Sequence, residues 1–196
     1  MKRISGLFAL LALIASAPTA LAAVHKYDAF LAGPSEFPPN ASPGTGFTEV
    51  DYDDIAHTLT VDVNFIGLLG TTTASHIHAA TAVAFTSTAG VATTTPTFAG
   101  FPLGVTSGVY HNVLDLTLAG SYNPAYVTAN GGTNASAEAA LVAAIAAGKS
   151  YLNIHTSVVP GGEIRGFLVP VPEPGTLALL ALGAVGFGLV AKRRRG

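Results

Sequence analysis

The sequence predicts a mostly β protein, an antiparallel β-sandwich of Greek-key type with one short helix before its final hairpin. Three observations favour this fold class. Thr, Val, Ala and Gly dominate residues 23–169 and Lys and Glu are scarce, a composition typical of strands. Short runs of this composition are separated by Gly-, Pro- and Asp-rich turns. The only strongly helical segment lies directly before the last two strands, which fits a sandwich with one helical crossover.

Seven strands are expected between these turns. Asp53–His57 is predicted to connect two of them as a hairpin, and Val159–Gly162 is predicted to turn between the last two. Gly33–Gly46 contains four prolines and is expected to form an irregular loop that covers a sheet edge. The expected strands are Tyr27–Ala32, Phe47–Tyr52, Thr58–Phe65, His76–Ala79, Val109–Thr117, Tyr151–Thr156 and Glu163–Leu168.

One helix is predicted from Ser136 to Ala147. Ser136 is its expected N-cap, and Glu138 is expected in the first turn, where the helix dipole favours an acidic side chain. Gly148 is the expected stop signal. The narrow apolar stripe of this helix consists of Leu141, Val142 and Ile145.

The N-terminus has the pattern of a secretory signal peptide over residues 1–22. Lys2 and Arg3 precede a short apolar run, and Ala20-Leu21-Ala22 provides the small residues that a signal peptidase requires before Ala23. The apolar run is too short to span a bilayer comfortably. The alternative is a permanent N-terminal anchor, which the small-residue site does not favour.

The C-terminus, residues 170–196, has three parts. A Pro-Glu-Pro motif precedes residues 176–191, which contain no charge and would rise about 24 Å as a helix, slightly less than the hydrocarbon core. A basic cluster follows and is expected to stay cytoplasmic, while the domain between the two ends is exported. The motif comprises Val171, Pro172, Glu173 and Pro174, and the basic tail comprises Lys192, Arg193, Arg194 and Arg195.

These C-terminal residues resemble the PEP-CTERM sorting signal of Gram-negative bacteria. The resemblance implies export by the Sec machinery, transient anchoring in the inner membrane, and cutting by an exosortase near the motif before delivery to the outer envelope or the exterior. A plain tail anchor is the alternative, and it would not account for the Pro-Glu-Pro motif. Removing Thr176–Gly196 is expected to abolish membrane retention and leave the domain of residues 23–169 folded.

The central domain is acidic and contains no cysteine. It has three basic residues against ten acidic ones, a net charge of −7, which argues against nucleic-acid binding. The lack of cysteine excludes catalytic thiols, cysteine-bound zinc and iron–sulfur clusters. No Ser–His–Asp order or phosphate-binding loop is evident, so no catalytic residue is predicted.

Three of the six histidines form a candidate metal site. His76 and His78 are two residues apart on a predicted strand and therefore share a face, and His155 lies on another strand. Three imidazoles suit copper or zinc and leave a position open. Asp62 or Glu163 could act as a fourth ligand or orient the histidines, and Glu163 and Arg165 share a strand face and could pair.

Structural alternatives exist for each of these patterns. Buried histidines often bond backbone carbonyls without any metal. His25, His57 and His111 are expected on the surface, because no comparable geometry links them. Asp51–Asp54 lacks the spacing and the closing Glu of an EF-hand loop and is predicted to be a turn with solvated carboxylates.

Three segments resemble the CHRD (chordin) domain family. They are the opening Phe30–Pro39, the His76–Ala80 segment, and Tyr151–Thr156 followed by Pro160–Gly166. The resemblance spans about Tyr27 to Leu168 and implies an extracellular β-rich module without a defined reaction. Gly67-Leu68 before His-x-His also resembles copper/zinc superoxide dismutase loosely, although that enzyme's cysteines and full zinc-loop histidines are missing.

The sequence therefore predicts an exported, non-enzymatic module of the cell surface or the exopolysaccharide matrix. The alternative is a copper- or zinc-binding protein, or a superoxide-dismutase-like metalloenzyme, that uses the three histidines.

Overall fold

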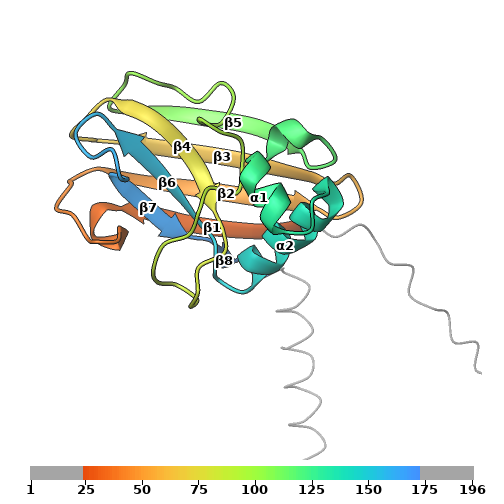
Figure 1. The fold of residues 1–196 in the computed structure, drawn as a ribbon. Helices are drawn as coiled ribbons and strands as arrows, with labels where there is room; N and C mark the ends of the chain where they lie inside the picture. Colours follow the sequence, from red (N-terminus) through yellow and green to blue (C-terminus); the bar gives the residue numbers. More distant parts are fainter. Residues whose placement is uncertain (1–23, 173–196) are drawn as a thin grey trace, which may run out of the picture.

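The protein folds as a curled antiparallel sheet with two short α-helices at one end (Figure 1). The computed structural model describes residues 24–172. The predicted mostly β, antiparallel fold class is confirmed. The elements are β1 (Val24–Ala32), η1 (Gly33–Ser35), β2 (Thr45–Asp53), β3 (Thr58–Ile66), β4 (Thr72–His78), β5 (Gly108–Asp115), η2 (Ala119–Ser121), α1 (Pro124–Ala129), α2 (Asn134–Ala146), β6 (Tyr151–Thr156), β7 (Ile164–Phe167) and β8 (Val169–Pro170).

Several predictions fall outside the described residues. They are the signal peptide of residues 1–22, Glu173 and Pro174 of the sorting motif, the helix at 176–191 and the basic tail at 192–195. Within residues 24–172, no helix has the length and apolarity needed to cross a membrane. Val171 belongs to the described part, and its backbone N–H donates to the carbonyl of Lys26 on β1.

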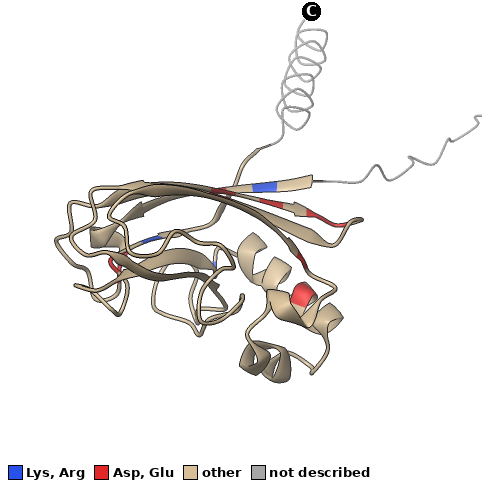
Figure 2. Cartoon of the chain, turned by 90° about the horizontal axis from the view of Figure 1, so that it is seen from above, with Lys and Arg blue, Asp and Glu red and all other residues tan. Residues whose placement is uncertain are grey.

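The two layers of the sandwich are halves of one continuous sheet. The strand order is β4-β6-β7-β1-β2-β3-β5, with β8 also pairing with β1. The half that contains β4, β6 and β7 joins the other through β1, where Ala32 lies opposite Arg165. After β3 the chain crosses to the other half as β4 and returns as β5, which pairs with β3. Seen from above, the sheet curls over on itself, and several acidic residues lie toward its helical end (Figure 2).

A single core fills the space inside the curl. Side chains alternate between faces along β2 and β3, so that every second residue is buried. Val50 and Val61 from this half join Ile77 and Leu152 from the other half in one cluster. Each such side chain stabilises the fold by about 1.5–3 kcal/mol. This core fixes β4 beside β6, which carry the three candidate ligands.

The predicted helix begins two residues before the expected start. Thr133 is the N-cap, and its hydroxyl and that of Ser136 form a capping box, so Ser136 is not the N-cap. Gly148 follows the last turn with a positive φ of 65°, as predicted for a stop signal. Because the helix begins earlier, Glu138 lies in the second turn and not in the first, so the predicted dipole interaction is wrong. Its side chain is buried, and Tyr52 and His57 bond its carboxylate.

The short helix α1 was not predicted. Asn123 caps it by accepting a hydrogen bond from the N–H of Ala125, and Pro124 occupies its first position. Both residue types are usual at a helix start, so the signal was present in the sequence. One α-helix was expected in the central domain, and residues 24–172 form two.

The seven predicted strands are present, six of them with different ends, and the two-residue strand β8 was not predicted. β6 has the predicted bounds, whereas β4 starts at Thr72 with a bulge before Ala74. β5 stops at Asp115, because the Asp115 carboxylate accepts hydrogen bonds from the N–H and hydroxyl of Thr117 and turns the chain. The two predicted turns, Asp53–His57 and Val159–Gly162, connect β2 to β3 and β6 to β7.

Candidate metal centre

The three candidate ligands meet on one face of the β4–β6 pair. In the antiparallel register His76 lies opposite Asn153, and Ala74 lies opposite His155. Residues that face one another across a ladder share a face, so His76, His78 and His155 project to the same side. His76 and His78 are buried and His155 is partly buried. The structure therefore brings the three histidines together from two strands that are distant in the sequence.

Backbone carbonyls determine which ring nitrogen of each histidine carries the proton. His76 Nε2 lies 2.6 Å from Pro96 O, His78 Nδ1 lies 2.9 Å from Ala89 O, and His155 Nδ1 lies 2.8 Å from Pro160 O. A carbonyl only accepts, so each of these nitrogens must donate. In a neutral ring the other nitrogen then keeps its lone pair. Those nitrogens are His76 Nδ1, His78 Nε2 and His155 Nε2, and all three are buried without a hydrogen-bond partner.

The distances between the rings suit a single ion. One ligand atom from each ring lies within 4.8 Å of the other two. Three such atoms lie within about 2.8 Å of a common point, and a zinc–nitrogen bond of about 2.0–2.1 Å requires only a small further approach. Hydrogen bonds from the remote nitrogens to carbonyls are the usual means of orienting histidine ligands.

Burial keeps the three rings neutral. Desolvation lowers the pKa of His78 to about 4, because a charged ring would lose its hydration, and neighbouring His76 and His155 lower it further. The pKa values of His76 and His155 are lowered for the same principal reason. A neutral imidazole is the form that binds a metal, so the free nitrogens are available at neutral pH.

The cluster continues into an aromatic and charged layer that the sequence did not predict. The Tyr151 ring stacks on His78 with the centroids 4.8 Å apart. The Arg165 guanidinium lies over the same tyrosine, 4.6 Å from its centroid, and its Nη1 donates to Ser87 O. Buried Glu36 is the ion-pair partner of Arg165, with 3.8 Å between Nε and Oε2. The opening pattern that contains Glu36 was the only sequence signal for this residue.

The predicted pair of Glu163 and Arg165 is wrong, because each has other partners. Glu163 is fully buried, and its carboxylate accepts from the hydroxyls of Ser42 and Thr156 at 2.6 Å each. The backbone N–H groups of Leu69 and Gly70 add two further donors. Burial opposes ionisation, but the four donors outweigh it, and the pKa of Glu163 lies below its ordinary value.

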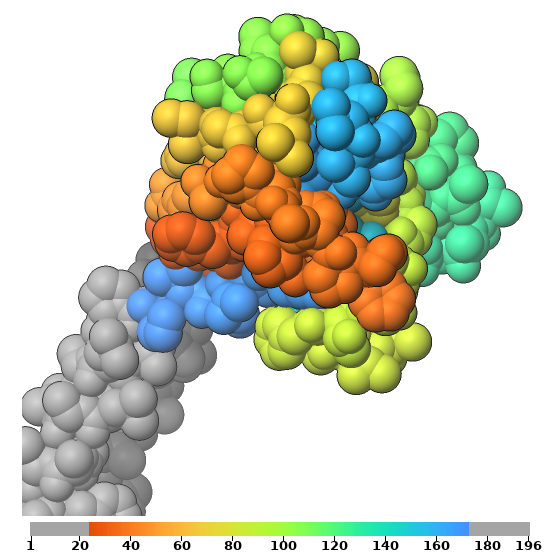
Figure 3. Space-filling view, turned by 90° about the vertical axis from the view of Figure 1, so that its left-hand side faces the viewer, coloured from red at the N-terminus to blue at the C-terminus, as the bar shows by residue number. Residues whose placement is uncertain are grey.

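Glu163 therefore connects loops rather than acting on the histidines. Asn40 strengthens the same junction by donating from Nδ2 to Glu163 O at 3.0 Å. In the end-on view, the loop after β1 lies beside the turn before β7 (Figure 3). Residues 36–44 of the Pro-rich segment are irregular as predicted, whereas residues 33–35 form η1 and residues 45–46 belong to β2. The irregular part packs against the 157–163 turn.

Asp62 is far from the three histidines. It lies on β3, in the other half of the sheet, and its Oδ1 is 2.7 Å from Nδ1 of His111. The structure does not bring it to the candidate site, so it cannot serve there as a ligand or an orienting residue.

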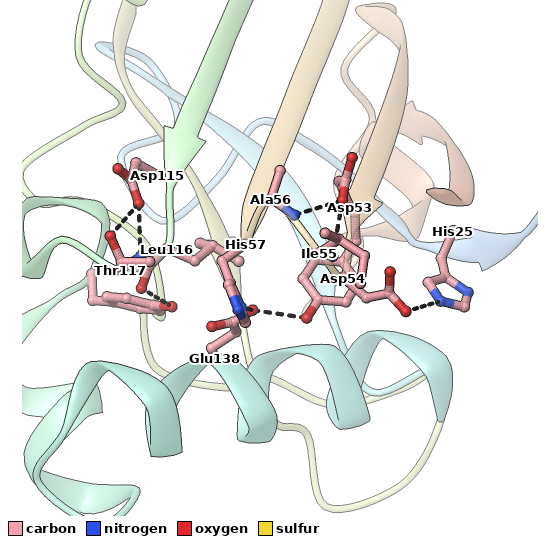
Figure 4. A network of polar contacts seen from close by, with 12 residues as sticks. His25, Asp53, Asp54, Ile55, Ala56, His57, Asp115, Leu116, Thr117 and Glu138 are labelled. Carbon is pink, nitrogen blue, oxygen red and sulfur yellow. Dashed lines mark hydrogen bonds and ion pairs between the residues drawn. The ribbon is translucent and has the colours of Figure 1, made fainter. Parts of the chain in front are cut away.

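The other three histidines lie at the surface, as expected, and face carboxylates. The His57 ring lies beside the Glu138 carboxylate (Figure 4), with 2.8 Å between Nδ1 and Oε1. The Tyr52 hydroxyl donates to the same oxygen. His25 Nε2 lies 4.0 Å from Oδ2 of Asp54. Asp53 accepts from two backbone N–H groups of the following turn, as a turn residue rather than a calcium ligand would.

Two family models match the chain. The CHRD domain family matches residues 27–168, and the PEP-CTERM protein-sorting motif matches residues 170–195. No curated protein and no solved structure matches the chain.

The fold and the two matches define an exported β-rich module. The chain belongs to the CHRD domain family. Its PEP-CTERM motif marks it for export, transient membrane anchoring and processing by an exosortase.

Proposed function

We propose that this exported CHRD domain is a non-enzymatic metal-binding module that takes up one zinc or copper(II) ion. The ligands are His76 Nδ1, His78 Nε2 and His155 Nε2. The observation that carries the proposal is that these three nitrogens are buried without partners, and that one ring nitrogen of each histidine lies within 4.8 Å of those of the other two. Burying a polar atom without a partner is costly, and an ion would remove that cost.

Imidazole nitrogen is a ligand that both zinc and copper accept. The alternative, a superoxide-dismutase-like enzyme, needs the same three nitrogens and an open coordination position. It would also require a route for substrate, whereas His76 is 6% and His78 is 8% exposed. Their burial supports a metal-binding role over an enzymatic one, because a substrate would have little access to the ion.

Metal analysis of the purified full-length protein tests the proposal. After treatment with a chelator and reloading with zinc or copper(II), we expect one ion per chain. His155→Gln should take up markedly less, because glutamine can still donate to Pro160 O but offers no imidazole. His111→Gln removes a surface histidine and should load like the wild type. A wild-type protein that retains no ion above the His155→Gln level would refute the proposal.

We further propose that the exported domain acts at the cell surface, in contact with exopolysaccharide. A shallow depression of about 280 Å³ on the β2, β3 and β5 strands supports this role. It combines apolar side chains, including Phe47, with polar ones that can bond sugar hydroxyls. Its polar lining residues include Glu49, Asp62, Asn64 and His111.

Truncation separates the sorting tail from the domain. A chain without Thr176–Gly196 should lose membrane retention and keep its circular-dichroism spectrum and its metal. Binding to purified exopolysaccharide should be equal for the full-length and truncated proteins. Loss of folding on truncation would place the domain boundary beyond residue 175, and no binding by either protein would refute the matrix role.

A further inference from the structure

Asn153 lies at the centre of the three histidines. It faces His76 directly across the β4–β6 ladder, and His155 is two residues further along the same strand on the same side. His78 is its diagonal neighbour, since His78 faces Tyr151. Asn153 is only 2% exposed, so its amide is enclosed within this patch.

The unpaired polar atoms of the cluster share one chemical character. Across residues 24–172, five buried side-chain nitrogens or oxygens lack a hydrogen-bond partner. Three are the lone-pair nitrogens of the histidines, and the other two are Asn153 Oδ1 and Glu36 Oε1. All five can accept, and none of them is placed as a donor. A cation among the three histidine nitrogens and Asn153 Oδ1 would satisfy these four acceptors together, whereas Glu36 Oε1 lies beside the Asn153 amide nitrogen.

The surroundings of Asn153 fix the direction of its amide. A Cβ placed on Gly162 would lie 2.7 Å from Asn153 Nδ2 and 2.7 Å from Glu36 Oε1, so these two atoms flank one point. The donor end of the amide therefore faces the Glu36 carboxyl group. Oδ1, at the other end of the same amide, is the atom left without a partner in the patch that Asn153 shares with the histidines.

Gly162 is required for this arrangement. Its φ of 128° is one that side-chain-bearing residues rarely adopt, and any Cβ would displace both Asn153 and Glu36. Gly162 thus serves the site as well as the turn.

We infer that Asn153 is the fourth ligand, and that its Oδ1 completes a closed site of three nitrogens and one oxygen. The inference rests on the proposed metal-binding function and deepens it. Four protein ligands in a tetrahedral arrangement are typical of structural zinc sites, whereas catalytic sites keep one position open. The amide oxygen also favours zinc(II) and copper(II) over copper(I), which prefers softer ligands. The ion consequently fastens β4 to β6 and does not meet a substrate.

Substitution of Asn153 in the full-length protein tests this assignment, with zinc for affinity and cobalt(II) as a spectroscopic probe. Asn153→Leu keeps the approximate size and removes the oxygen. We expect zinc affinity to fall at least tenfold and the visible cobalt spectrum to change. Asn153→Asp keeps an oxygen and adds a charge, and should bind zinc at least as tightly as the wild type with a four-coordinate cobalt spectrum.

The two variants distinguish a ligand from a structural amide. An Asn153→Asp protein that binds zinc more weakly than the wild type would overturn the inference, because a carboxylate oxygen at the position of Oδ1 should bind the ion at least as well as the amide oxygen. An Asn153→Leu protein with wild-type affinity and cobalt spectrum would also overturn it, while leaving the three-histidine site intact. A wild-type protein that binds neither ion would instead refute the proposed function itself.

Discussion

The six histidines form two groups of three that differ in the partner of each ring. The inner group bonds backbone carbonyls, and the outer group faces carboxylates. A carbonyl holds one proton in place on a neutral ring and leaves the second nitrogen free, whereas a carboxylate favours the charged ring, which has no free lone pair. The partner therefore decides whether a histidine can bind a metal. The inner group is His76, His78 and His155, and the outer group is His25, His57 and His111.

The largest difference between the inner and the outer histidines should appear in the stability that zinc adds to the protein. At a zinc concentration one hundred times the dissociation constant, the free energy of unfolding of the wild type should rise by about 2.7 kcal/mol. His78→Gln should lose this gain, because a ligand is missing, and His57→Gln should keep it. Urea unfolding with and without zinc measures the difference. Equal gains in both variants would contradict the division into two groups.

His78 of the inner group and His57 of the outer group should also respond to pH in opposite directions in metal-free protein. The pKa of His78 is lowered to about 4 by burial, so below about pH 6.5 the unfolded chain binds a proton that the folded chain excludes. Stability should therefore be complete above about pH 6.5 and fall toward pH 4, by at most about 1.4 kcal/mol per pH unit for one ring.

His57 should show the reverse dependence. Its hydrogen bond to Glu138 raises its pKa, so the stability that this pair contributes is present below about pH 6.5 and is lost as the pH rises through the folded pKa. Ring proton shifts in an NMR titration follow each histidine separately. Inner rings that titrate near pH 6.5 would show that burial does not govern them.

Removing the carboxylate of Glu138 should lower the free energy of unfolding more than removing either of the side chains that donate to it. Glu138→Leu leaves the buried Tyr52 hydroxyl without its acceptor, and we expect a loss of about 1–3 kcal/mol in the free energy of unfolding. Tyr52→Phe removes only the donor and should cost about 1 kcal/mol. Denaturant unfolding measures both variants. A larger loss in Tyr52→Phe than in Glu138→Leu would contradict this account of the network in Figure 4.

The exposed pair of His111 and Asp62 should contribute least to the free energy of unfolding. Their side chains are 65% and 47% exposed, so solvent screens the interaction between them. His111→Gln should leave both the unfolding midpoint and the metal content unchanged. A measurable change in the unfolding midpoint or in the metal content would contradict this expectation.

The local pattern of the sequence was sufficient for much of the fold. The bounds of β6, both hairpin turns and the glycine stop after α2 depend on interactions between residues close in the chain. The start of α2 was predicted incorrectly, because Ser136 and Thr133 are both good caps and only the three-residue spacing of the capping box selects Thr133.

The candidate site was predictable only in part. The alternation of His76 and His78 follows from the period of a strand, and the suggestion of His155 as a third ligand is consistent with the structure. Asp62 was misplaced, and Asn153 and Glu36 were not recognised, because their positions depend on which strands and loops become neighbours. Neither the spacing nor the charge of these residues in the sequence indicates which strands and loops become neighbours.

The sequence by itself determined the strands to within a few residues, the two hairpin turns, the shared face of His76 and His78, and the C-terminal sorting motif. Each of these is encoded by residues that are near one another in the chain. Only the tertiary structure decided that β4 pairs with β6, that Asn153 faces His76, and that carbonyls of distant loops hold the free nitrogens inward. Those contacts join segments up to about eighty residues apart, and long-range pairing is selected by the packing of the whole core rather than by any local pattern.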